Sequence, residues 1–153
     1  MKLTIREATT DDLPQVLALY AQPGLDDGRV LDIEQARAIH AQFARYPSYR
    51  LFVACDSQAP DRVLGSYALL VMHNLAHLGT PSAIAEDVVV DARCRSQGIG
   101  REMMDHAVGQ ARAAGCYKLA LSSNRRRVRA HAFYESLGFA RHGVSFVIDT
   151  SSS

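Results

Sequence analysis

The six residues from Arg95 to Gly100 have the composition of an anion-binding loop. Arg95 is followed by Gly98 and Gly100, and the next residues repeat apolar side chains every three to five positions, as an amphipathic helix does. The first N–H groups of a helix have no partner within it and lie at the positive end of its dipole, and glycine lets an anion approach them. We therefore expect a phosphate group to bind at this loop.

Two longer phosphate-binding patterns do not fit this loop. The dinucleotide fingerprint requires a third glycine where the chain has Met103, and an acidic residue about 20 positions further on. A nucleotide P-loop requires Gly-Lys-Ser/Thr after four spacer residues, and nothing here matches it. The shorter motif Arg95-x-x-Gly98-x-Gly100 remains, with a glycine-containing helix start as its simplest alternative interpretation.

The apolar patterns around this loop predict the elements that position it. Residues 83–90 are a β-branched apolar run between turn residues, which indicates a mostly buried strand before the loop. Further strands are expected over residues 2–8, 50–55, 62–72, 116–122 and 143–149, and helices over residues 13–20, 32–46, 99–111 and 126–137. The order βααβββαβαβ predicts an α/β fold in one domain, residues 1–150, with a frayed tail at residues 151–153.

Composition narrows the class of protein. With 153 residues, 48% of them hydrophobic, the chain suits one domain with a buried core. A net charge of +1 without a basic stripe argues against a nucleic-acid partner. The sequence contains neither an apolar run of signal-peptide length nor 18 uninterrupted apolar residues, so we expect a cytoplasmic protein without a membrane partner. Three cysteines without a Cys-x-x-Cys pair fit reduced intracellular thiols.

Four segments resemble, in order, the GNAT superfamily of acyl-CoA-dependent N-acyltransferases. They are "AEDVVV", "RSQGIG", "GCYKLALSSN" and "AHAFYESLGF", which together cover about residues 83 to 140. The opening "TIREATTDDL" is also similar to the first strand and helix of that family. The resemblance implies a GNAT-like fold, in which a mixed and mostly antiparallel sheet is flanked by helices.

The resemblance also implies where acetyl-CoA, the acyl donor substrate, binds. Backbone N–H groups of the loop would hold the pyrophosphate of coenzyme A, with Arg95, Ser96, Gln97, Gly98, Ile99, Gly100 and Arg101 as binding residues. In this family the strands ending near Val90 and Ser122 separate, and the pantetheine arm lies between them. The thioester would lie beside Val88, Val89 and Val90, where a backbone N–H polarises its carbonyl.

An amine acceptor creates a protonation problem that a carboxylate can solve. An alkylamine with a pKa near 10 is protonated at neutral pH, and only its neutral form attacks a thioester. Glu86 and Asp87 are adjacent on a strand and should point to opposite faces. Relatives use glutamates near this place as bases, so we favour Glu86 and keep Asp87 as the alternative. Both could instead be solvated charges near the strand end.

Two residues near the carboxyl terminus acquire roles from the resemblance. Tyr134 matches the general acid that protonates the departing thiolate, and the alternative is a core tyrosine bonded to backbone. Asn124 matches a position that holds the pantetheine or cysteamine portion, and the alternative is a helix N-cap.

The arginines from Arg125 to Arg127 would crowd the first turn of a helix, where cations oppose the helix dipole. An anion could compensate them: the 3′-phosphate of coenzyme A, for which we assign Arg127, or an acidic acceptor such as an amino sugar phosphate or aminophosphonate. Solvent and salt are the simpler alternative. Local segments resemble glucosamine-phosphate and aminoalkylphosphonate N-acetyltransferases, which weakly favours the acidic acceptor.

No metal site is expected. His73 and His77 are four apart but lie at a strand end and loop, without a third ligand. No cysteine has the surroundings of a nucleophile, so we expect direct transfer in a ternary complex.

These inferences predict an acetyl-CoA-dependent N-acetyltransferase that acts on a primary amine of a small molecule, with an anionic molecule as one option. A protein or peptide N-acetyltransferase is one alternative, and a non-catalytic acyl-CoA-binding sensor is another. Homodimer formation is common among relatives, and the closing strand over residues 143–149 is a plausible interface.

Overall fold

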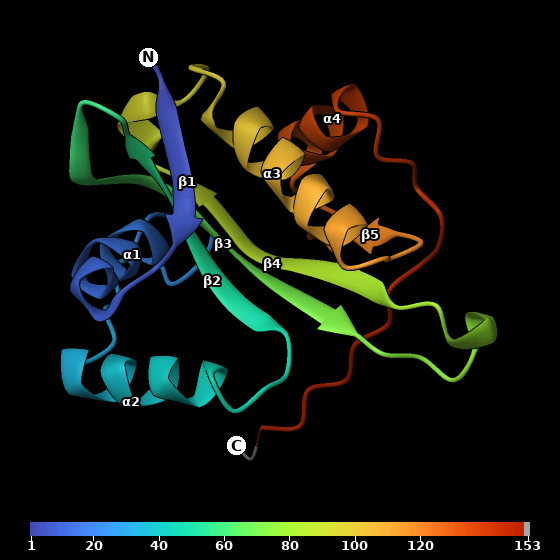
Figure 1. Ribbon diagram of the computed structural model, residues 1–153. Coiled ribbons are helices and arrows are strands. Elements are labelled where there is room, and N and C mark those ends of the chain that lie inside the picture. The colour runs from blue at the N-terminus through green and yellow to red at the C-terminus, as the bar shows by residue number, and fades with distance from the viewer. Residues whose placement is uncertain (152–153) are drawn as a thin grey trace. The chain divides into compact units, whose positions relative to one another are not determined.

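The computed structural model describes residues 1–151 (Figure 1). Of the expected frayed tail only Ser151 is therefore described, and residues 152–153 lie outside the described part. The chain forms two compact units, Met1–Leu121 and a second that begins at Ser122. Each unit is described by itself below.

A five-stranded sheet forms the centre of the first unit. Its strands follow the sequence order across the sheet: β1 (Leu3–Glu7), β2 (Tyr49–Asp56), β3 (Ala59–Met72), β4 (Ser82–Val90) and β5 (Leu119–Ala120). The first four strands are antiparallel to their neighbours, whereas β5 is parallel to β4. The mixed, mostly antiparallel sheet that the resemblance implied is therefore confirmed.

Helices cover both faces of this sheet. The first unit contains α1 (Leu13–Tyr20), α2 (Ile33–Phe43) and α3 (Ile99–Ala113), and the second contains α4 (Val128–Ser136). On β2, Leu51 and Val53 join the apolar cluster of α1, while Phe52 between them meets the ring of His106 on α3 at 4.9 Å. Because alternate side chains of a strand point to opposite faces, α1 and α3 lie on opposite faces of the sheet (Figure 1).

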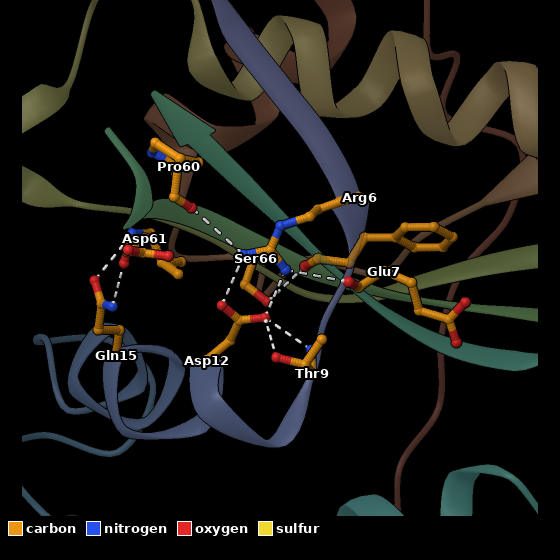
Figure 2. A network of polar contacts seen from close by, with 10 residues as sticks. Arg6, Glu7, Thr9, Asp12, Gln15, Pro60, Asp61 and Ser66 are labelled. Atoms are coloured by element: carbon orange, nitrogen blue, oxygen red, sulfur yellow. Dashed lines mark hydrogen bonds and ion pairs between the residues drawn. The ribbon is translucent and has the colours of Figure 1, made fainter. Parts of the chain in front are cut away.

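A polar network holds β1 to the start of α1 (Figure 2). Arg6 donates two hydrogen bonds to the carboxylate of Asp12, at 2.7 and 2.9 Å, and the N–H of Thr9 donates to the same carboxylate at 2.7 Å. Asp12 is buried, and its hydrogen bonds with Arg6 hold the pKa of its carboxyl below the ordinary value. Thr9 is therefore the residue that precedes the first helical turn, Thr10–Asp12.

The closing strand expected over residues 143–149 is absent from the structure. The segment lies outside every helix and strand among residues 1–151. Its apolar side chains, Val144, Phe146, Val147 and Ile148, are between 80 and 95% exposed. A β-branched apolar run becomes a strand only when a neighbouring strand satisfies its backbone groups, and no such pairing is formed here.

None of the helices within residues 1–151 combines the length and the apolarity that a membrane crossing requires.

Candidate active site

A β-bulge interrupts β4 at the two candidate carboxylates. Ala68 of β3 faces Glu86, but Ser66, two residues earlier, faces Val89, so β4 contains one extra residue between these pairs. Asp87 lies in this bulge with φ of +52°, a left-handed conformation that is uncommon for a residue with a side chain. The prediction that the two carboxylates point to opposite faces rested on regular alternation, which does not hold at a bulge.

Other titratable groups surround Asp87. Its carboxyl has a raised pKa, chiefly because the surrounding protein removes water and secondly because the Asp26 carboxylate is near. Burial, followed by the charge of Asp87, raises the pKa of the hydroxyls of Tyr20 and Tyr49. Asp87 remains accessible to solvent in the chain. An accessible carboxylate with a raised pKa is suited to accept a proton.

The edge of β4 that carries the three valines is open within the first unit. The strand β5 pairs with β4 only at Ala83 and Ile84, and its pairing stops there. The predicted strand over residues 116–122 is thus only two residues long, Leu119–Ala120. Beyond Ile84 the outward backbone groups of β4, up to Val88, Val89 and Val90, have no partner on β5.

The loop after β4 has a defined backbone. Asp91 is buried, accepts from the backbone N–H of Arg93 at 2.9 Å and pairs with its guanidinium at 2.8 Å, which fixes the turn that leaves the strand. Ser96 and Gly98 both have left-handed conformations, with φ of +64° and +82°. Gly98 is the N-cap residue of α3, which begins at Ile99. The expected loop at a helix N-terminus is confirmed, with residues Arg95 to Gly98 exposed.

The helix α3 is anchored directly behind this loop. Ile99, Met103 and Met104 are at most 2% exposed. A Cβ atom on Gly65 of β3 would lie 2.9 Å from the sulfur of Met103, so only glycine lets the helix approach the sheet this closely without a shift of that side chain. The packing holds the first N–H groups of α3 in place.

In the second unit, Asn124 organises the turn before α4. Its carboxamide oxygen accepts from the N–H of Arg126 at 2.9 Å, and its backbone carbonyl accepts from the N–H of Arg127 at 2.9 Å and pairs with the ring of His131 at 2.8 Å. The N-cap residue of α4 is Arg127, so Asn124 is not the helix cap. The arginines expected in the first helical turn instead precede the helix, and all are exposed.

Tyr134 lies on α4 between two phenylalanines. Its ring centroid is 5.3 Å from that of Phe133 and 5.7 Å from that of Phe139. Burial raises the pKa of its hydroxyl, and the charge of Arg127 opposes that rise. Within residues 122–151 no backbone group bonds to this hydroxyl, unlike in the alternative of a purely structural tyrosine. Gly138, with φ of +96°, follows the C-cap residue of the helix, Leu137.

Gln22 contributes contacts that the sequence did not indicate. Its side chain hydrogen-bonds to the backbone of Val90 and of Ala92, 68 and 70 positions away. No spacing rule connects residues so distant in sequence. Tyr20, Asp26 and Tyr49 were missed for the same reason, because only the fold brings them near Asp87.

A groove of about 320 Å³ lies between α2 and the start of β2, where Phe43 stacks on Tyr49 at 4.2 Å. None of the predicted site residues lines it. Among residues 1–151, His, Cys, Asp and Glu side chains form no group of three or more that could hold a metal ion.

The family of the chain follows from comparison with known proteins. A model of the acetyltransferase (GNAT) family matches residues 13–139, which is well over half of the chain. The chain therefore belongs to the GNAT acetyltransferase family, in agreement with the resemblance of its motifs.

The chain is also similar to particular known proteins. The chain is 34% identical over 92 residues to the glucosamine 6-phosphate N-acetyltransferase of Trypanosoma brucei brucei, covering 60% of each protein. It is 30% identical over 142 residues to the aminoalkylphosphonate N-acetyltransferase of Salmonella typhimurium, covering 93% of the chain and 88% of the relative. The chain thus spans less than two thirds of the trypanosome relative and, at 58%, of a rice relative.

The fold is also found in solved structures. A crystal structure of a Trypanosoma brucei acetyltransferase superposes with a TM-score of 0.82 at 28% identity, covering 97% of this chain and 99% of that one.

Proposed function

We propose that this chain is an N-acetyltransferase that moves acetyl from acetyl-CoA directly to a primary amine of a small anionic molecule. Family membership supports the reaction class. The observation that carries the proposal is a short path along the chain, in which the bulge at Asp87 is followed by the open edge of β4 at Val88 to Val90 and then by the exposed loop at the start of α3. This path combines backbone N–H groups, a carboxylate and a helix N-terminus on consecutive elements.

The donor half of the site requires backbone N–H groups free to meet an anion. Ser96 and Gly98 both have left-handed conformations, and residues of this kind occur in the backbone nests whose N–H groups bind anions in other proteins. A Cβ atom on Gly98 would meet nothing within 4 Å, so the space beside it is open. We assign the pyrophosphate of coenzyme A to Arg95, Ser96, Gln97, Gly98, Ile99, Gly100 and Arg101. On the resemblance alone, Asn124 is proposed for the pantetheine portion and Arg127 for the 3′-phosphate. Acetyl-CoA supplies the activated acyl group.

The open edge of β4 would stabilise the reacting carbonyl. A thioester oxygen gains negative charge as the amine attacks, and a backbone N–H aimed at it lowers the barrier. We assign this role to the edge formed by Val88, Val89 and Val90, where β5 provides no partner.

The base is assigned to the bulge. Asp87 becomes the preferred candidate over Glu86, because its pKa is raised and it has two tyrosine hydroxyls near it. Its conformation also supports a functional role, since strained backbone accumulates at active sites. Tyr134 remains the proposed acid for the departing thiolate, with a modest gain expected because a thiol of pKa near 8.5 already leaves well.

The acceptor is proposed to be anionic. Two relatives are named for glucosamine 6-phosphate and for aminoalkylphosphonates, which combine an amine with a phosphate or phosphonate group. Arg125, Arg126 and Arg129 are exposed beside Arg127 and are available to such a group.

The experiment has two stages. Calorimetry first measures acetyl-CoA binding, and release of coenzyme A is then followed with amino sugar phosphates, aminophosphonates, neutral amines and peptides. Binding with release stimulated by an anionic amine supports the proposal. Release stimulated only by peptides would favour a protein acetyltransferase, and tight binding with no release across the panel would favour a sensor.

An arginine variant tests the acceptor class. We expect Arg125→Gln with Arg126→Gln to raise the KM for an anionic acceptor at least about tenfold, because a hydrogen bond to a charged group contributes about 1.5 to 3 kcal/mol net and about 1.4 kcal/mol corresponds to a factor of ten. The same double variant should leave the KM for a neutral amine unchanged. The control Arg112→Gln should leave the KM for the anionic acceptor unchanged. Equal effects on both acceptors would assign these arginines to another role.

Cytoplasmic location of the protein remains a prediction.

A further inference from the structure

A single carboxamide connects the end of α1 to the end of β4. The side-chain nitrogen of Gln22 donates to the carbonyls of Leu19 and Val90 at 3.0 and 3.1 Å, and its oxygen accepts from the N–H of Ala92 at 2.7 Å. Val90 is the last residue of β4, and Ala92 begins the turn toward the loop at Arg95. Gln22 therefore holds the chain on both sides of Asp91.

The three partners determine the chemistry required at position 22. Two of them are carbonyl oxygens and the third is an N–H, so the amide is bound in one orientation only. If the amide oxygen and nitrogen exchanged places, the oxygen would face two carbonyl oxygens and the nitrogen would face an N–H group. A glutamate could still accept from Ala92, but a carboxylate has no donor for Leu19 or Val90.

We infer that Gln22 is a positioning residue for the acyl donor, which it serves by holding Val90 and Ala92 in place. The inference rests on the proposed function, since it assumes that acetyl-CoA uses the β4 edge and the following loop. Without this clamp, the segment that joins edge to loop samples more conformations, and binding has to restore the order. The three hydrogen bonds of the Gln22 side chain all go to backbone groups, so its effect acts through the elements that it fixes.

Gln15, inside α1, offers a matched control for Gln22, which follows the end of that helix. Its carboxamide nitrogen donates to the carbonyl of Asp61 at 2.6 Å and its oxygen accepts from the N–H of Val63 at 2.9 Å, a contact shown in part in Figure 2. This clamp has the same chemistry as that of Gln22, but it holds the start of β3. Removing it tests the general effect of losing a backbone clamp from α1.

The experiment compares the unmodified chain with Gln22→Ala, Gln22→Glu and Gln15→Ala. Calorimetry measures the Kd for acetyl-CoA, steady-state kinetics separates KM from kcat, and amide hydrogen exchange at Ala92 and Val63 reports each clamp without ligand. We expect Gln22→Ala to raise Kd and KM for acetyl-CoA about three- to tenfold, with kcat at saturation within about twofold. Gln22→Glu should weaken binding at least as much.

Gln15→Ala should speed exchange at Val63 and leave the Kd unchanged. Equal Kd values for the folded Gln22 variants and the unmodified chain would overturn the inference while the proposed function stands. Equal weakening by Gln15→Ala would also overturn it, since the effect would then be general. Failure of the unmodified chain to bind acetyl-CoA would overturn both.

Discussion

The carboxylate of Asp87 combines a strained backbone with a raised pKa, and both features bear on its role as base. We expect Asp87→Asn to reduce kcat/KM by about 10²- to 10⁴-fold, the usual range for a general base, and Glu86→Gln to reduce it less. A base acts in its deprotonated form, so kcat/KM should fall as pH falls through a pKa above the ordinary aspartate value of 3.8. Asp87→Asn should remove this acid limb.

Rate measurements from pH 4 to 9 test this assignment, with Asp105→Asn on the exposed face of α3 as a control for loss of a carboxylate. A larger loss in Glu86→Gln than in Asp87→Asn would return the role of base to Glu86.

Asp12 makes the stability of the fold depend on pH. Its folded pKa is lower than the ordinary value of 3.8, so the folded chain binds fewer protons than the unfolded chain in acid. The stabilisation is fully present above pH 3.8 and is lost as pH falls through the folded pKa. We expect Asp12→Asn to lower the free energy of unfolding by about 1 to 3 kcal/mol at pH 7, because it removes the charge that pairs with Arg6. The loss stays within this range because solvent still reaches Arg6.

Urea unfolding at pH 7 and at successively lower pH measures this effect, with the exposed neighbour Asp11→Asn as the control. The difference between Asp12→Asn and the unmodified chain should shrink toward acid. A constant difference across the pH range would show that the carboxylate charge is not its source.

Single positions differ in how far the sequence predicts their surroundings. The anion-binding loop was predictable, because glycine spacing and helix periodicity are local signals. The bulge at Asp87 was not, because an extra residue in a strand is defined by the register with β3. The contacts of Gln22 were also hidden, since they depend on how α1 packs beside β4.

The start of α3 requires a left-handed residue, and two glycines of the same element let this be measured. Gly98 has φ of +82° with open space around it, so Gly98→Ala should cost about 1 to 2 kcal/mol of stability from backbone strain alone. Gly109 lies inside α3, also with open space, and Gly109→Ala should stabilise the chain by about 0.5 to 1 kcal/mol.

Chemical denaturation of both variants measures the sign of each change in stability. Calorimetry measures the affinity of each variant for acetyl-CoA. Weaker binding in Gly98→Ala alone is expected, because its N–H groups would turn away from the anion. A stable Gly98→Ala variant with unchanged affinity would show that the loop tolerates another conformation.

Helices and strands with a clear apolar periodicity in the local sequence were predicted well, whereas an element that also needs a partner distant in sequence was not. The α1, α2 and α3 helices and the strands β1 to β4 follow their apolar patterns to within a few residues. The segment over residues 143–149 has an equally strong strand pattern, yet it forms no strand. The apolar pattern indicates only that the side chains favour an extended conformation, whereas a strand also requires a neighbouring strand with free backbone groups.

This unpaired segment leads to a prediction about the assembled protein. Four apolar side chains at positions 144 and 146 to 148 are at least 80% exposed, and burial of each would contribute about 1.5 to 3 kcal/mol. Contiguous exposed apolar residues with strand propensity commonly mark an interface. We propose that the chain forms a homodimer in which this segment is buried.

Light scattering after size exclusion, over a range of protein concentrations, measures the assembly. Phe146→Ser with Ile148→Ser should shift the chain toward monomer, because both changes remove apolar area from the segment. Leu75→Ser with Leu78→Ser is the matched control, since both leucines are fully exposed in the connection between β3 and β4. A dimer that persists in the first variant and dissociates in the second would place the interface at that connection, and a monomer at all concentrations would exclude this assembly.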